Sequence, residues 1–564
     1  MRTKMQAISM PLHLISVMAA CSLLSLCMLL MTMISKPLSD MPRRRVSPSL
    51  FVPGVTNTLE PPPLQVMELH FILRLSFSFS LGGNIQLDLS ETFRDFHYDH
   101  TKGLVRSGVS FTLDEFNLRL GALGLFMPHG QCYHVYLGGH AQTGGYGQLT
   151  RGFGLFADHV TELEIINADC QKITVNKVSE PDLFFALLGG SPGNFGVLTH
   201  FTIKPLRDVD HPLSRGMKLV CLYDKITLKN LLDVMVMMAR DSDFPQDYDY
   251  CVTLQSHDQQ IFILNPDLDQ QMKEKHPELY NDGRIAFQPT MIIIFVQWAN
   301  TKGPGQDYDP SFFFAVRDAI QRDHDLPKIV ITLFDGEKPM SKMTREWIFS
   351  IVREFEMPYI KRCKLTNSKT LLEDKWTEWM VDRVEEVETR HRDVSLTPNN
   401  IVKLSLQFQN FGGNNSGFFK NANDGTSHSF RDSTIGVVHD CFYEGSEGMR
   451  FAESWQKKMD EEGVGPNGTF SKEDRRLFWG SFENSKGGWN LKDSWSLYYD
   501  SRDKFERLSE IKRKVDPQNV FTPNAFSLGQ QPAASNAITA VKTKYNDGAM
   551  VQRKIKRLKT LMGN

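Results

Sequence analysis

The glycine-rich segment around residue 140 limits what this chain can fold into more than any other stretch. Five of the ten residues from Gly138 to Gly147 are glycine, and each glycine loses more backbone entropy on folding than another residue would. We therefore expect this segment to lie outside regular helices and strands. Its cost must be offset by a close approach of the backbone to another group, for which a planar cofactor or a pyrophosphate is the natural candidate. An ordinary tight turn is the alternative interpretation.

Spacing and composition exclude several other functions. The glycines match neither G-x-G-x-x-G after a strand nor G-x-x-x-x-G-K-[ST], so neither a Rossmann nor a P-loop nucleotide site is predicted. The 64 Lys and Arg are balanced by 66 Asp and Glu, which leaves no basic field for nucleic acid. The eight cysteines include no CxxC pair, so we expect no disulfide scaffold and no metal site.

The N-terminal region contains a long apolar run. Residues 12–34 carry no charge and are enough to cross a bilayer as a helix. A membrane anchor and a cleaved signal peptide are both compatible with this pattern, so we expect a membrane-anchored or secretory-pathway protein. The positive charges on both sides of the run do not fix its orientation. Residues 36–66, with three consecutive prolines at 61–63, are typical of an extended linker.

The remaining pattern predicts an α+β protein. Between residues 84 and 206 short apolar runs alternate with glycine, and helical phasing is present at Leu113–Leu120 and Pro181–Leu188. From residue 207 to about 490, β-prone runs alternate with amphipathic helices, which indicates an antiparallel sheet with helices on one face. We expect strands near 217–223, 250–255, 260–264, 291–298, 401–408 and 434–442, and helices near 228–239, 312–321, 344–355, 370–384 and 504–514.

Several ordered motifs together resemble one family. They are HGQCYHVYLGGHAQTGGYG at 129–147, RGFGL at 151–155 with Asp158, LEIINAD at 163–169, DLFFALLGG at 182–190, GNFGVLT at 193–199 and DPQNVF at 516–521. This set resembles the berberine bridge enzyme-like FAD-linked oxidases of the vanillyl-alcohol oxidase/p-cresol methylhydroxylase superfamily. The resemblance implies FAD as cofactor and an FAD-binding domain of that type, followed by a substrate domain.

The resemblance also assigns roles to residues. In relatives the cysteine eight positions before the histidine of Gly-Gly-His bonds to the flavin, which corresponds to Cys132 and implies covalent FAD; a small buried cysteine is the alternative. His140 would lie near the flavin, where a donor stabilises the reduced form. Tyr498 and Tyr499 stand near the place of a family tyrosine above the flavin, as a catalytic base or as an aromatic pocket wall. The other expected cofactor-binding residues are Gly138, Gly139, Gly144, Gly145, Tyr146, Gly147, Asp158, Gly190, Asn194, Phe195, Gly196 and Val197.

One family element is missing. The early Arg-x-Gly-Gly-His diphosphate loop has no counterpart, and residues 64–82 occupy its place. In the substrate domain, Gly412-Gly413 and Ser429-Phe430-Arg431 resemble pocket-lining elements, with a structural salt bridge as the alternative role for Arg431.

These inferences divide the chain and leave two functions open. The expected parts are an anchor or signal at 1–35, a linker at 36–66, an FAD-binding domain at 67–206 whose first part is incomplete, a substrate domain at 207–490, a return to the FAD domain at 491–530 and a basic tail at 531–564. The first function is an oxidoreductase that moves hydride from an alcohol, sugar or amine carbon of a small molecule to flavin N5, with oxygen as final acceptor. The second is a membrane-anchored homologue with impaired FAD binding that acts as a non-catalytic binding protein.

Overall fold

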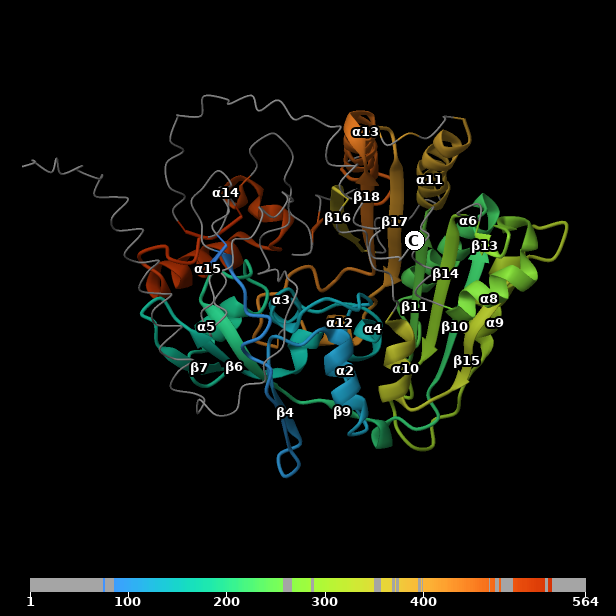
Figure 1. Ribbon diagram of the computed structural model, residues 1–564. Coiled ribbons are helices and arrows are strands. Elements are labelled where there is room, and N and C mark those ends of the chain that lie inside the picture. The colour runs from blue at the N-terminus through green and yellow to red at the C-terminus, as the bar shows by residue number, and fades with distance from the viewer. Residues whose placement is uncertain are drawn as a thin grey trace, which may run out of the picture. The chain divides into compact units, whose positions relative to one another are not determined.

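Two antiparallel sheets organise the chain in the computed structural model, one formed before residue 207 and one after it (Figure 1). The structure describes residues 75–76 and 86–529, except 257–265, 286–288, 349–356, 368–370, 372–374, 394–396, 398, 423, 466, 472–475, 478–489 and 523–525. The expected anchor, linker and basic tail, as well as the expected strand at 260–264, lie outside these residues. In the described part, no helix combines the length and apolar character needed to cross a bilayer.

The first sheet has five strands in the order β3-β4-β8-β6-β7. Its strands are β3 (Phe96–Asp99), β4 (Leu104–Gly108), β6 (Val160–Ile166), β7 (Lys172–Asn176) and β8 (Val197–Ile203). The helical elements around it are α2 (Leu113–Gly121), α3 (Leu137–Gln142), α4 (Thr150–Phe153), η1 (Phe156–His159) and α5 (Pro181–Leu187). A short ribbon, β5 (Leu125–Phe126) with β9 (Leu206–Arg207), leads toward the second sheet.

The second sheet has eight strands in the order β15-β10-β14-β11-β17-β18-β16-β19. Its strands are β10 (Arg215–Leu222), β11 (Tyr248–Gln255), β14 (Met291–Trp298), β15 (Ile331–Glu337), β16 (Tyr359–Thr366), β17 (Val402–Asn410), β18 (Ile435–Tyr443) and β19 (Arg476–Leu477). Its helices are α6 (Lys225–Arg240), α8 (Pro266–Lys275), α9 (Ser311–Gln321), α10 (Met340–Trp347), α11 (Lys375–Asp393), α12 (Gly417–Lys420) and α13 (Gly445–Gly463).

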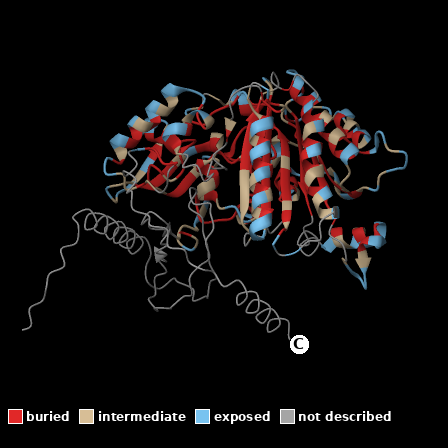
Figure 2. Cartoon of the chain, turned by 90° about the horizontal axis from the view of Figure 1, so that it is seen from above, coloured by how far each residue is buried: buried red, intermediate tan, exposed pale blue. Residues whose placement is uncertain are grey.

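Helices cover one face of the second sheet and part of the other, so the expectation of helices on one face alone is wrong. Side chains that alternate along β10, β11, β14 and β17 pack with α6, α9, α11 and α13 in one core. The opposite side chains of β10 and β14, among them Val220 and Ile293, pack with Met272 of α8 and Trp347 of α10. Because successive strand residues point to opposite faces, the near-continuous burial of these strands (Figure 2) required cover on both sides.

Most expected elements after residue 84 are confirmed in type. The runs at 217–223, 250–255, 291–298, 401–408 and 434–442 correspond to β10, β11, β14, β17 and β18. The helical phasing at 113–120, 181–188, 228–239, 312–321 and 504–514 corresponds to α2, α5, α6, α9 and α15 (Arg502–Val515). The phasing at 344–355 and 370–384 overlaps α10 (Met340–Trp347) and α11 (Lys375–Asp393) with displaced bounds, and residues 349–355, 370 and 372–374 of these ranges lie outside the described structure.

The glycine-rich segment is partly helical, which corrects the expectation that it avoids regular structure. Gly138 and Gly139 belong to α3, whose buried residues include Leu137 and Ala141. The side chains of Gln142 and Thr143 donate hydrogen bonds to the carbonyls of Gly138 and Gly139 at 3.0 and 2.9 Å. Burial and these local bonds offset the entropy cost of the two glycines.

The C-terminal segment returns to the first sheet. Leu508 and Ile511 of α15 pack in the same core as the five strands, together with Leu491 of α14 (Leu491–Ser494). The ammonium of Lys512, which is fully buried, donates to Asn194 O at 2.6 Å and pairs with Asp516 at 2.5 Å. The amide N–H of Leu528 donates to Asn194 Oδ1 at 2.7 Å. The first domain is therefore built from two distant parts of the chain.

Candidate functional site

One face of the second sheet carries a patch of polar side chains, which includes the buried carboxylate of Asp440. Along β17, Leu404, Leu406 and Phe408 enter the helix-covered core, so Ser405, Gln407 and Gln409 point to the opposite face. The ladder register places Gln409 between Cys251 of β11 and Gly436 of β18. The alternating sequence at 402–410 was a signal for this polar face, although it did not lead us to single out these glutamines.

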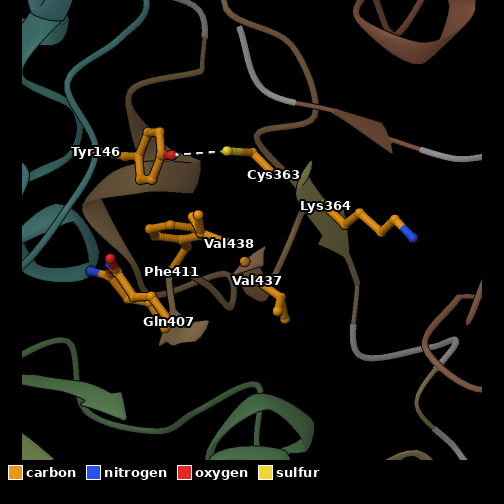
Figure 3. A pocket seen from close by; sticks show the side chains of 9 residues that line it. Tyr146, Cys363, Lys364, Gln407, Phe411, Val437 and Val438 are labelled. Atoms are coloured by element: carbon orange, nitrogen blue, oxygen red, sulfur yellow. Dashed lines mark hydrogen bonds between the residues drawn. The ribbon is translucent and has the colours of Figure 1, made fainter. Parts of the chain in front are cut away.

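The glycine-rich segment and the residues just before it lie against this polar face. Gln131 Nε2 donates to Cys251 Sγ at 3.2 Å, and Gln409 Nε2 donates to Gly147 O. The hydroxyl of Tyr146 lies 3.4 Å from Cys363 Sγ on β16, as Figure 3 shows. The two domains therefore meet at residues that the sequence had marked as cofactor-binding.

A small cavity lies at this meeting point. Its lining consists of Tyr146, Cys363, Lys364, Gln407, Gln409, Phe411, Gly436, Val437 and Val438 (Figure 3). Its volume of about 10 Å³ is close to the least that holds one water molecule. The side chains around it are packed closely enough that a larger ligand would have to displace some of them.

Tyr146 is a partly buried hydrogen-bonding group and not a base in this setting. Burial is the main cause that raises the pKa of Tyr146 well above its ordinary value, and the nearby Cys363, Cys132 and Asp440 add to it. The phenol therefore keeps its proton near neutral pH. Cys132, which contributes to this shift, is a free and partly exposed cysteine, so its thiol lies near the same seam.

His140 is a buried neutral imidazole next to the Gly144-Gly145 pair. Burial, with a smaller effect of His129, lowers the pKa of His140 to about 3. Its Nε2 is buried and has no hydrogen-bond partner in the described structure. A Cβ added to Gly145 would stand 2.6 Å from that nitrogen. An unpaired buried nitrogen is costly, which makes His140 a position that suits a ligand contact.

Different structural constraints require glycine at different positions of this segment. Gly144 and Gly145 have φ of 103° and 68°, a backbone conformation that side chains disfavour. A Cβ on Gly147 would stand 1.8 Å from His129 O, so the close approach at Gly147 is to the chain's own backbone. A Cβ on Gly138 would meet the Val109 side chain at 3.2 Å. Helix packing and a tight backbone crossing thus account for part of the glycine content.

Asp158 forms a buried ion pair with Arg431, while its expected cofactor contact stays a prediction. Its two oxygens accept hydrogen bonds from Arg431 at 3.0 and 2.6 Å, and the amide N–H of Leu155 donates to Asp158 Oδ2 at 2.8 Å. Both side chains of the pair are at most 4% exposed. The carboxylate is therefore satisfied within the protein, and the structural salt bridge considered for Arg431 is what the structure shows.

The second group of expected cofactor residues lies where the C-terminal segment docks. The side-chain amide of Asn194 donates to Ser191 Oγ at 2.8 Å while its oxygen binds Leu528. Phe195 is 2% exposed within the first core, and Val197 begins β8. A Cβ on Gly190 would meet Ala186 O at 2.3 Å, and Gly196 has a φ of 145°. These contacts explain the residues structurally; their cofactor role stays a prediction.

Tyr498 and Tyr499 are buried in the core of the first domain, and their catalytic role stays a prediction. They are 2% and 1% exposed and pack in the core of the first domain. The ring of Tyr498 lies 6.0 Å from that of Phe526, and the ring of Tyr499 lies 5.9 Å from that of Phe505. Burial raises the pKa of Tyr499 well above its ordinary value, whereas a base needs a pKa near the working pH.

The described residues fit FAD as a cofactor. The unpaired Nε2 of His140, the left-handed Gly144-Gly145 step and the partly exposed thiol of Cys132 stand close together in the chain and at the seam between the domains. A second buried imidazole, His428, also has an Nε2 without a partner in the described structure. Buried donors that lack partners are rare in folded proteins, and FAD offers oxygens that would satisfy them.

Comparison with known families and proteins agrees with this fit. A family model described as "FAD binding domain" matches residues 74–176, and one described as "Berberine and berberine like" matches residues 490–525. The FAD-linked oxidoreductase ZEB1 of Gibberella zeae is 45% identical over 82 residues, which cover 14% of each chain. The matched segments span only 14% to 29% of the length of the first curated relatives.

Solved structures share the fold over a longer range. The xylooligosaccharide oxidase of Myceliophthora thermophila C1, in complex with xylobiose, aligns with a TM-score of 0.54 and 16% identity over 78% of this chain and 81% of that one. The glucooligosaccharide oxidase of Acremonium strictum, described with a 6-S-cysteinyl, 8α-N1-histidyl FAD, aligns with a TM-score of 0.54 and 16% identity over 77% and 80%. Because the sequence identity is this low, these alignments show a common fold and no shared function.

Proposed function

We propose, from the chain's membership of the berberine bridge enzyme-like, FAD-linked proteins, that it is an FAD-dependent oxidoreductase acting on a hydroxyl-rich small molecule. The observation that carries this proposal is the contact between the glycine-rich segment and the polar face of the second sheet. Tyr146 and Gly147 on one side bind Cys363 and Gln409 on the other. A cofactor held by the first domain would thus work beside side chains of the second.

The proposed roles follow from the chemistry of each side chain. FAD, when bound, supplies the acceptor for a hydride taken from a substrate carbon. Cys132 would hold the cofactor through sulfur, and His140 would donate a hydrogen bond to it as a neutral imidazole. Tyr146, whose raised pKa keeps it protonated, would orient substrate or cofactor as a donor.

Among alcohols, sugars and amines, the lining favours an alcohol or a sugar. Gln407 and Gln409 line the cavity with amides, which carry both donors and acceptors. Gln407 Nε2 donates to Gln409 Oε1 at 3.2 Å and Gln409 Nε2 donates to Gly147 O, so the oxygen of Gln407 is the group best placed for a substrate. Ser405 adds a hydroxyl two residues along β17. Such amides match substrate hydroxyls, whereas a substrate ammonium would require a carboxylate or an aromatic cage. The carboxylate on this face, Asp440, is already paired with Lys361 at 3.2 Å. The oligosaccharide oxidases among the solved structures support the same substrate class.

Three further parts of the proposal concern the wider setting. We propose oxygen as the final acceptor of the electrons and a covalent thioether at Cys132, because the matched cysteine precedes a Gly-Gly-His motif. We also propose that the apolar run at 12–34 directs the chain to a membrane or the secretory pathway.

The test is anaerobic reduction of the purified full-length protein. We expect a flavin absorption band that bleaches with neutral oligosaccharides or simple alcohols, followed by peroxide release when oxygen is admitted. Gln407→Leu should raise KM more than it lowers kcat, while Gln270→Leu on the exposed surface of α8 should change neither. Bleaching by amines alone would contradict the substrate class. A colourless protein that takes up no FAD would favour the non-catalytic binding protein instead.

A further inference from the structure

A second imidazole, from the second domain, lies against the Gly144-Gly145 pair. His428 lies in the connection between α12 and β18 and is 4% exposed. A Cβ built on Gly144 would stand 3.2 Å from His428 Cε1 and 3.4 Å from its Nδ1. His428 therefore contacts Gly144, just as His140 contacts the next residue, Gly145. Two histidines from different domains thus flank one dipeptide.

The backbone around His428 is fixed on the first domain. The amide N–H of Ser427 donates to Leu188 O at 2.8 Å, and the hydroxyl of Ser427 donates to the same oxygen at 3.2 Å. Gly189, with a φ of 106°, approaches so closely that a Cβ there would stand 2.3 Å from His428 N. Three residues later, Arg431 closes the pair with Asp158. The position of His428 over the glycine-rich segment is therefore set on both sides.

The imidazole of His428 is neutral and unsatisfied at one nitrogen. Its Nε2 is buried without a hydrogen-bond partner in the described structure. Burial is the main cause that lowers the pKa of His428 well below its ordinary value, and the positive charges of Arg431 and Lys504 lower it further. A neutral imidazole among cations is suited to an electron-rich oxygen, which it can meet as an N–H donor.

We propose that His428 is a cofactor contact contributed by the second domain, which donates a hydrogen bond from Nε2 to an oxygen of bound FAD opposite His140. This inference rests on the proposed function, because it takes FAD as the ligand. It goes beyond that function in assigning part of cofactor retention to the second domain. Binding of FAD then also holds the two domains together.

The test measures FAD affinity in full-length protein that carries Cys132→Ala, so that binding is reversible. His428→Phe keeps a ring of similar size and removes both nitrogens, and we expect its dissociation constant for FAD to rise about tenfold, the loss for one such hydrogen bond. His428→Gln keeps an amide donor and should restore most of the affinity. His439→Phe is the matched control, because His439 is also buried with an unpartnered Nε2 but lies against Gln456 and Trp455.

Thermal melts separate contact from structural support. A contact predicts that His428→Phe reduces the FAD-induced rise in Tm while the Tm of the FAD-free protein stays near that of the His439→Phe control. If the phenylalanine variant does not fold, His428→Leu gives the same comparison, because it also removes both nitrogens. An FAD dissociation constant that is unchanged in a folded His428 variant without a side-chain donor overturns the proposal.

The outcome also distinguishes this inference from the proposed function. FAD binding that depends on His428, in a protein whose flavin no substrate reduces, would leave the contact standing and overturn the activity. Substrate-driven reduction with affinity independent of His428 would overturn the contact alone. Failure of the parent protein to bind FAD would overturn both.

Discussion

At the scale of single residues, Cys132 is the side chain whose replacement gives the clearest answer. Cys132→Ser should leave no flavin bound to acid-precipitated protein, since serine cannot form the thioether. The measurement is flavin fluorescence of the washed precipitate together with the intact mass. Cys170→Ser is the matched control, because Cys170 is also a partly exposed cysteine. Flavin that stays attached in Cys132→Ser would assign the bond to another residue.

Breaking the buried pair of Arg431 and Asp158 should strongly destabilise the protein. Removal of one partner leaves the other charge buried without compensation, which costs about 3 to 5 kcal/mol. We therefore expect Arg431→Met to lower the free energy of unfolding by about that amount in urea titrations. Arg322→Met breaks an exposed pair with Asp318, whose side chains are 44% and 68% exposed, and should cost less than about 1 kcal/mol. Equal losses in the two variants would refute the assignment.

At the scale of elements, the contact between β11 and α4 should make stability depend on pH. Burial raises the pKa of Asp249 to about 7, although the nearby Arg151 and backbone N–H groups act against it. The folded chain thus holds a proton that the unfolded chain releases near pH 4, so the free energy of unfolding should fall as pH rises from about 4 to 7.

Replacement of that carboxyl should flatten the pH profile. In Asp249→Asn the fall between about pH 4 and 7 should shrink by up to about 4 kcal/mol, the equivalent of three pKa units. Denaturant titrations at several pH values measure it, with Asp318→Asn on the surface of α9 as the control. An identical slope in the Asp249 variant and the wild type would show that Asp249 does not titrate in this range.

The sequence predicted elements well and their surroundings less well. Apolar periodicity located β10, β14 and α6 because it reports which side chains are buried. It did not locate the second covered face, since continuous apolar strands such as 291–298 do not reveal which element covers each side. The helix α3 and the buried Tyr499 depend on tertiary packing, as does the match of His428 with Gly144. Spacing along the chain does not encode such contacts.

At the scale of the whole molecule, passage through the secretory pathway should leave a covalent mark. The chain has glycosylation sequons at Asn414-Asn415-Ser416 and Asn467-Gly468-Thr469. Asn414 and Asn467 are both exposed in the structure, so a glycan attached to either side chain would not clash with packed residues. We expect the protein from a eukaryotic secretory host to lose mass on glycosidase treatment, and Asn414→Gln with Asn467→Gln to remove that loss. A host-made protein of unmodified mass would argue against entry into the pathway.

The return of α15 to the first sheet has a consequence for biosynthesis. The strand β8 ends at Ile203, yet the core that it shares is completed by Leu508, 305 residues later. At about 5 to 20 residues per second, a ribosome needs roughly 15 to 60 s to synthesise the residues between these two positions. The second sheet leaves the ribosome during this interval and can fold first. The first domain must wait with its apolar strands uncovered, so its yield should depend on chaperones more than that of the domain made after it.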